Sequence, residues 1–245
     1  MTDKILCIVH QATSDTGRVG RVLRELGYEV ETTCPRREGP LPPPETLAGA
    51  VMFGGPMSAN DHDMDPGLRA EIDWLEAALA AGTPFVGICL GAQMLAKVLG
   101  STVAWHPEDM HEIGYVPVTP TKAWCDCMPE PMYFYQWHKE TFDLPRGAVL
   151  LAEGDRYPNQ AFRYGDKNYG IQFHPEVTRE IMLRWAGNAG DRLERPEVQG
   201  LEQQMASNER YEPQIEAWTR RFLAEWLGAE WIDADEAGAA VAAAE

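Results

Sequence analysis

The segment FVGICLGAQ, residues 85–93, decides the fold of this chain. Residues 85–88 form a continuous apolar run, which is typical of a strand buried on both faces of a parallel sheet. Residues 92–99 are then helical in character and are followed by Gly100, a residue type that commonly ends a helix. A buried strand that leads directly into a helix predicts one unit of a parallel α/β sheet.

The chain before this segment repeats the same alternation. We predict strands at 5–9, 30–33 and 50–53, and helices at 18–26 and 68–81, the second of which has leucine and isoleucine at helical spacing. The proline-rich residues 35–44 are predicted to hold no regular element. The predicted fold class is therefore α/β, a three-layer sandwich with a mostly parallel, doubly wound central sheet.

The chain after this segment is richer in short strands, which we predict at 115–118, 132–137, 149–151, 161–163 and 169–173. Their close spacing indicates antiparallel neighbours added to the same sheet. From residue 179 the chain is predicted to be helical, with an amphipathic stretch around Ile215, Trp218, Phe222 and Trp226 that we interpret as packing. We predict one domain over residues 1–235 and a flexible tail at 236–245.

The composition argues against several classes of function. The 245 residues carry a formal net charge of −17, which repels phosphate backbones and anionic lipid, so neither nucleic acid nor a membrane surface is expected as a partner. No apolar run reaches the roughly 18 residues that a membrane span needs, and no secretory signal is recognised. The 5 cysteines are scattered, unlike a disulfide framework, so a reducing cytoplasm is the expected location.

Cys89 is the candidate nucleophile. It lies between Gly87 and Gly91, and glycines two residues before and after a nucleophile permit the sharp strand-to-helix turn called a nucleophile elbow. The N–H of Leu90 then faces the reacting carbonyl, and the start of the helix favours negative charge there. A single cysteine after a strand is more often a core residue, but the two glycines favour the catalytic interpretation.

His174 and Glu176 are the candidate partners of this nucleophile. They occur in GIQFHPE, residues 170–176, where a strand again runs into polar residues. A thiolate nucleophile needs an imidazole that accepts its proton and later returns one to the leaving group. The imidazole in turn needs a carboxylate that orients it. A lone histidine is more often structural, and its occurrence together with an elbow cysteine favours catalysis.

The two motifs GICLGAQ and QFHPE together resemble those of the class I glutamine amidotransferases, and most of all the free-standing proteins related to the amidotransferase domain of GMP synthase. The resemblance covers roughly residues 4–185. It implies a flavodoxin-like fold and a catalytic triad of Cys89, His174 and Glu176. It also implies that Gln93 lies near the substrate, which would be glutamine or a small γ-glutamyl compound.

Gly54-Gly55-Pro56 matches the glycine-rich loop of the same family. A Gly-Gly pair after a buried strand lets the backbone approach a ligand closely, so Gly54 is expected at the substrate. The N–H groups of Gly55 and Leu90 are expected to form the oxyanion hole. His138, in WHKE at 137–140, resembles a wall of the glutamine pocket, and a surface turn after a strand is the alternative.

No cofactor and no metal are expected. Cys125 and Cys127 are too close together for the usual metal-binding motif, and no matching Cys or His pair follows them. The glycine-rich phosphate-binding motifs are absent from the sequence.

Three functions remain open at this point. The first is an amidase that supplies ammonia to a separate synthetase, for which the apolar face near Trp218 would be a docking surface. The second is an autonomous enzyme, alone or as a homo-oligomer, that cleaves a γ-glutamyl amide through a thioester and passes the acyl group to water or an amine. The third is a non-catalytic binding or regulatory member of the fold. We expect the second, because the helices beyond the HPE motif exceed what an amidase subunit needs.

Overall fold

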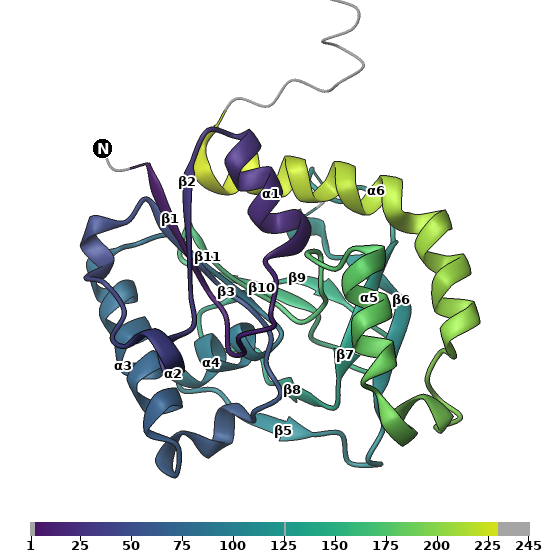
Figure 1. Cartoon of the computed structure of the whole chain (residues 1–245). Helices are drawn as coiled ribbons and strands as arrows, with labels where there is room; N and C mark the ends of the chain where they lie inside the picture. The colour runs from purple at the N-terminus through teal and green to yellow at the C-terminus, as the bar shows by residue number, and fades with distance from the viewer. Residues whose placement is uncertain (1–2, 125, 230–245) are drawn as a thin grey trace, which may run out of the picture.

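The computed structural model describes residues 3–124 and 126–229. Within these ranges a 9-stranded sheet has the order β2-β1-β3-β4-β11-β10-β9-β6-β7, and β5 pairs separately with β8 (Figure 1). The strands are β1 (Lys4–Ile8), β2 (Glu29–Thr33), β3 (Gly49–Met52), β4 (Phe85–Ile88), β5 (Val103–Trp105), β6 (Glu112–Pro120), β7 (Met132–His138), β8 (Glu140–Phe142), β9 (Val149–Glu153), β10 (Ala161–Tyr164) and β11 (Asn168–Ile171).

The direction of the strands divides the sheet into two parts. Strands β2, β1, β3, β4 and β11 are parallel to one another. Strands β10, β9, β6 and β7 each pair antiparallel with their neighbours. The predicted α/β fold with a mostly parallel sheet is confirmed, and so is the antiparallel addition from the second half of the chain.

Helices cover both faces of the sheet (Figure 1). Apolar residues of α1 (Gly17–Glu25), α5 (Arg179–Gly187) and α6 (Leu201–Leu227) belong to one buried cluster, with Ile5 and Cys7 of β1. Residues of α3 (Pro66–Ala81) and α4 (Leu90–Val98) belong to a second, with Leu6 and Ile8 of the same strand. Side chains of a strand alternate between the two faces, so an uninterrupted apolar strand supplies both cores.

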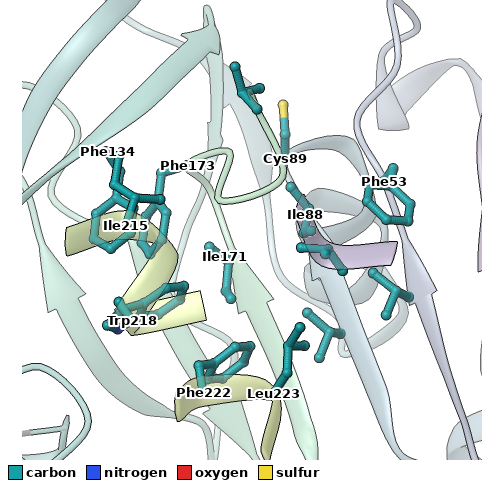
Figure 2. Close-up of a cluster of buried hydrophobic side chains, with 14 of the residues drawn as sticks. Phe53, Ile88, Cys89, Phe134, Ile171, Phe173, Ile215, Trp218, Phe222 and Leu223 are labelled. Carbon is teal, nitrogen blue, oxygen red and sulfur yellow. The ribbon is translucent and has the colours of Figure 1, made fainter. Parts of the chain in front are cut away.

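The amphipathic stretch predicted near the end of the chain packs in the first of these clusters. Ile215, Trp218, Phe222 and Trp226 of α6 are at most 3% exposed. Trp218 stacks on Phe222 at 5.0 Å between ring centroids. Figure 2 shows Trp218 and Phe222 below Phe134 and Phe173, on the side of the cluster away from Cys89. The packing interpretation is confirmed.

Three details differ from the predictions. Residues 35–44 were expected to be irregular, but they hold a one-turn helix, α2 (Pro35–Glu38), and lead into η1 (Pro44–Thr46). Proline is tolerated in the first turn of a helix, where its missing N–H would have no partner in any case. The pair β5–β8 was not predicted, and the helical region after residue 179 is interrupted by η4 (Gly190–Glu194). The remaining short helices are η2 (Ala59–Asp63) and η3 (Lys122–Trp124). The predicted tail at 236–245 lies outside the described residues.

Candidate active site

Cys89 lies at the sharp turn between β4 and α4. Its backbone has φ 52° and ψ −104°, a conformation that a residue with a side chain rarely adopts and that costs roughly 1–3 kcal/mol. A Cβ on Gly87 would lie 2.4 Å from the backbone of Gly91, and one on Gly91 would lie 2.2 Å from the carbonyl oxygen of Met52. Both glycines are therefore required by close backbone approach, as the elbow motif predicts. In Figure 2 the sulfur of Cys89 points away from the apolar cluster.

His174 and Glu176 form a buried hydrogen-bonded pair just after β11. The Nδ1 atom of His174 is 2.7 Å from Oε1 of Glu176, and both residues are 2% exposed. The backbone N–H of His174 donates to the carbonyl of Tyr135, and the ring packs edge-on against Trp185 at 5.0 Å between centroids. His174 is therefore held both through its backbone and through its ring.

The imidazole and the thiol face each other next to Gly54. A Cβ on Gly54 would lie 2.9 Å from Cε1 of His174 and 3.5 Å from Cβ of Cys89. Nε2 of His174 makes no hydrogen bond to a nitrogen or oxygen atom within residues 3–124 and 126–229. Burial disfavours a positive charge on this ring, but Glu176 and Cys89 outweigh burial and raise the pKa of His174 to about 10. An imidazolium is thus favoured at neutral pH, as expected of a ring that has taken a proton from a thiol.

Gly55 and Leu90 follow Gly54 and Cys89 in the chain, and each has a backbone N–H. A Cβ on Gly55 would lie 2.9 Å from Cδ2 of Leu90, so the glycine loop packs directly against the start of α4. Neither N–H donates a hydrogen bond to any part of the chain that the structure describes. Two free N–H groups at adjoining positions suit a developing negative charge on oxygen.

Gln93 and His138 both bind the carbonyl of Glu140. Nε2 of Gln93 donates to this oxygen at 3.0 Å, and Nδ1 of His138 is also 3.0 Å from it. The second ring nitrogen of His138 is 3.0 Å from a carboxylate oxygen of Glu112. The alternative of a surface turn is wrong for His138, which is the last residue of β7 and is buried. Both of its ring nitrogens already have protein partners, so it can serve the site as a wall but offers no free polar atom.

A cavity of about 320 Å³ lies beyond the glycine loop. The residues that line it include Ser58, Trp105, Lys139 and Glu140. The hydroxyl of Ser58 donates to the Glu140 carboxylate at 2.8 Å. The carbonyl of Glu140 binds Gln93 on the helix that follows Cys89, and Cys89 and His174 are not among the residues that line the cavity.

Arg18 was not singled out from the sequence, where it is merely one residue of a predicted helix. Its fully buried guanidinium donates to the carbonyl of Pro175, between His174 and Glu176, and pairs with Glu212 and Glu216 of α6. The N–H of Arg18 also donates to the carbonyl of Glu176 at 3.0 Å. Only the packing of α1 and α6 against the HPE segment reveals this role, since these segments are far apart in the sequence.

Residues 3–124 and 126–229 contain no cluster of three or more His, Cys, Asp or Glu side chains able to hold a metal ion. Cys127 is buried, and burial raises the pKa of its thiol to about 12, whereas Cys125 lies outside the described residues. No helix within the described ranges is long and apolar enough to cross a membrane.

This chain is similar to known proteins in sequence. Residues 12–182 match the family model described as glutamine amidotransferase class-I. The chain is 31% identical to the glutamine amidotransferase-like protein YfeJ of Salmonella typhimurium, over 71% of this chain and 76% of that protein. It is also 31% identical to the glutamine-hydrolysing GMP synthase of Porphyromonas gingivalis, over 72% of this chain but only 34% of the synthase.

A solved structure gives the same result. The crystal structure of a glutamine amidotransferase from Thermotoga maritima superimposes with a TM-score of 0.83 and 33% sequence identity, and the match covers 91% of this chain and 97% of that one. Since the family model spans more than half of the chain, and sequence and structure agree, the chain belongs to the class I glutamine amidotransferase family.

Proposed function

We propose that this protein cleaves a γ-glutamyl amide with Cys89 as nucleophile, His174 as proton carrier and Glu176 as the orienting carboxylate. One observation carries the proposal. The strained elbow places Cys89 against a buried His174–Glu176 pair, with Gly54 in contact with both. Family membership supports reaction at a glutamine amide in general, and this arrangement supplies the chemical groups that the reaction needs.

The steps follow from these groups. The Cys89 thiolate attacks the δ-carbonyl carbon, and the N–H groups of Gly55 and Leu90 stabilise the resulting oxyanion. His174 gives its proton to the leaving nitrogen, so the C–N bond breaks, an amine or ammonia departs and a γ-glutamyl thioester remains. His174 then takes a proton from water or an acceptor amine, which attacks the thioester and restores the thiolate. A γ-glutamyl acid or a new γ-glutamyl amide is released.

The cavity beside Glu140 is the proposed place for part of the substrate. It contains a cation, Lys139, and the carboxylate of Glu140, and a γ-glutamyl donor carries one ammonium and one carboxylate at its α-carbon. A pocket of about 320 Å³ suits a small molecule and is at the small end of common ligand sites.

A second candidate is an amidase that supplies ammonia to a separate synthetase. The GMP synthase relative favours it, because the chain is similar to 34% of a protein that is named a glutamine-hydrolysing synthase. Against it, the apolar face of α6 that could have docked a partner is buried within this chain. We therefore prefer the autonomous enzyme. A non-catalytic role would leave the strained Cys89 elbow without a purpose.

The experiment measures ammonia release from glutamine and amine release from γ-glutamyl dipeptides by the purified chain. Cys89→Ala is expected to lower turnover by a factor of roughly 10⁴ or more, because the nucleophile cannot be replaced. Cys127→Ala is the matched control and is expected to retain turnover if the fold survives. A chloromethyl ketone analogue of glutamine should label Cys89, as located by mass spectrometry. Labelling mainly at another cysteine would overturn the assignment.

A further inference from the structure

Another buried histidine–carboxylate pair packs against the glycine loop. His10 follows β1, and its Nε2 is 2.9 Å from Oε2 of Glu71 on α3, with both side chains fully buried. The other ring nitrogen, Nδ1, is 3.3 Å from the carbonyl oxygen of Gly54. A Cβ on Gly55 would lie 2.9 Å from Cβ of His10, so the ring packs directly against the loop. Nothing in the reaction as described uses this pair.

The hydrogen-bond partners of His10 determine where its proton lies. Both ring nitrogens face oxygen atoms that accept hydrogen bonds, a carboxylate on one side and a carbonyl on the other. A buried pair of this kind is least costly when its net charge is zero, which requires two protons shared between His10 and Glu71. Two arrangements satisfy this requirement, imidazolium with carboxylate and imidazole with carboxylic acid. If both contacts are hydrogen bonds, Nδ1 carries a hydrogen in each of them. His10 therefore donates to the carbonyl of Gly54.

This bond acts on the peptide that supplies one proposed oxyanion donor. The carbonyl of Gly54 and the N–H of Gly55 belong to one peptide unit, and the described chain has no cis peptide bonds. In a planar trans peptide the C=O and N–H point to opposite sides. A hydrogen bond that holds the Gly54 carbonyl toward His10 consequently directs the Gly55 N–H away from it. The same loop borders Cys89 and His174 through Gly54.

We propose that His10, oriented by Glu71, is a positioning residue that holds the Gly54–Gly55 peptide in the direction required for oxyanion stabilisation. The proposal rests on the proposed function and adds a part to its machinery. Glycine residues have no side chain that would keep their peptide in one orientation, so an external hydrogen bond is needed to limit its rotation. Because the oxyanion exists only after attack, the benefit should appear in kcat and not in substrate binding.

The test compares four variants of the full chain. His10→Leu removes the donor, and His10→Asn restores an N–H near the position of Nδ1. Glu71→Gln removes the carboxylate and keeps the side-chain shape. His62→Leu is the matched control, because the His62 side chain is only 17% exposed and contacts a backbone carbonyl at 3.1 Å, that of Ala59 and not one of the glycine loop.

Three measurements separate positioning from general damage. The first is kcat and KM on the γ-glutamyl donor. The second is the affinity for a γ-glutamyl aldehyde, which forms a hemithioacetal with Cys89 and so places an oxygen in the oxyanion hole. The third is the rate at which iodoacetamide alkylates Cys89, a reaction that needs the thiolate but no oxyanion hole.

His10→Leu is expected to lower kcat by about 10- to 100-fold, somewhat less than complete loss of one oxyanion donor. The affinity for the aldehyde should fall by a similar factor, while KM and the alkylation rate change by less than about twofold. His10→Asn should recover most of the loss, Glu71→Gln should show a smaller loss of the same kind, and His62→Leu should match wild type.

The proposal is overturned if His10→Leu keeps wild-type kcat, or if alkylation of Cys89 slows as much as turnover does. If His10→Leu does not fold, Glu71→Gln and His10→Asn decide the matter by the same ratio of kcat to alkylation rate. A wild-type chain that binds the aldehyde but turns over no donor would contradict the proposed function alone. The aldehyde affinities of the variants would then still test the role of His10.

Discussion

At the scale of single residues, the neighbours of His174 control its protonation state. Glu176 and Cys89 raise the pKa of this buried imidazole to about 10, against the effect of burial. A ring that keeps its proton through neutral pH can protonate the leaving nitrogen as soon as the tetrahedral intermediate forms. The proposed proton-transfer step would thus depend on Glu176 and Cys89.

We predict that the ring signals of His174 in an NMR titration will change well above pH 7. In Glu176→Gln the midpoint should move to lower pH, because the largest favourable charge is lost while burial remains. Turnover should fall less in Glu176→Gln than in His174→Ala, since an amide can still orient the ring. A midpoint that is unchanged in Glu176→Gln would show that another group sets the protonation of His174.

The raised pKa of His174 also affects the stability of the fold. Because the pKa of His174 in the folded state lies above that of a free histidine, its contribution to folding is complete below about pH 6.5 and is lost as pH rises through about 10. The free energy of unfolding of wild type should therefore decrease over this interval more than that of His174→Ala. Urea unfolding at a series of pH values measures the difference.

At the scale of secondary-structure elements, α1 and α6 together hold the HPE segment. The start of α1 binds two carbonyls of this segment through Arg18, and α6 supplies the carboxylates of Glu212 and Glu216 that neutralise the guanidinium. A Cβ on Gly17 would lie 2.0 Å from the carbonyl oxygen of Glu176, so the contact between α1 and the segment is very close. The buried side chain of Arg18 thus connects the C-terminal helix to the candidate catalytic residues.

We predict that Arg18→Gln will lower the free energy of unfolding by about 2–3 kcal/mol and also lower kcat. Removing the buried guanidinium leaves the Pro175 carbonyl without this donor, although the partly exposed Glu212 and Glu216 can be hydrated. Arg21→Gln is the control, because Arg21 binds the same Glu216 from a position that is 45% exposed, and it should cost at most about 1 kcal/mol. Equal effects of the two substitutions, in urea unfolding and in turnover, would contradict the predicted role of Arg18.

At the scale of the whole molecule, α6 completes the core. Its aromatic residues fill the space beside β7 and the residues after β11, where Trp218 contacts Phe134 at 4.8 Å and Phe173 at 5.6 Å between ring centroids. A surface kept for a partner would stay exposed in the isolated chain. Burial of this face is consistent with a protein whose own C-terminal region stabilises its active site.

We therefore predict that Trp218→Ala will destabilise the isolated chain by about 3–5 kcal/mol, the usual cost of removing a large aromatic residue from a core. Leu201→Ala, on the same helix but 40% exposed, should change stability by less than about 0.5 kcal/mol. Urea unfolding of both variants measures the difference. A near-zero effect of Trp218→Ala would show that this face of α6 contributes little to the fold.

If the protein acts without a partner, its activity should not depend on other proteins. The pure chain should turn over a γ-glutamyl dipeptide or glutamine at its full rate, and addition of a cell extract should not stimulate it. Negligible turnover of every such donor, restored by a synthetase, would instead support the ammonia-supplying subunit.

The features that depend on local chain geometry could be predicted from the amino-acid sequence. A sharp strand-to-helix turn needs glycines at fixed spacing, so the motif around Cys89 could be read without coordinates. Buried parallel strands need continuous apolar runs, so the parallel core could be predicted in the same way. The prediction for residues 35–44 was wrong because proline can begin a helix as well as prevent one.

Only the tertiary structure decided which distant side chains meet. The bonds of His10 to Gly54, and of Arg18 to Pro175, join residues 44 and 157 positions apart. No local pattern marks either residue. Each acts through the backbone carbonyl of a distant residue, and every residue type has such a carbonyl. His138 shows the same limit, since its motif was readable but its bond to Glu112 depends on the pairing of β6 with β7. Contacts of this kind are created by packing, and packing is a property of the folded chain as a whole.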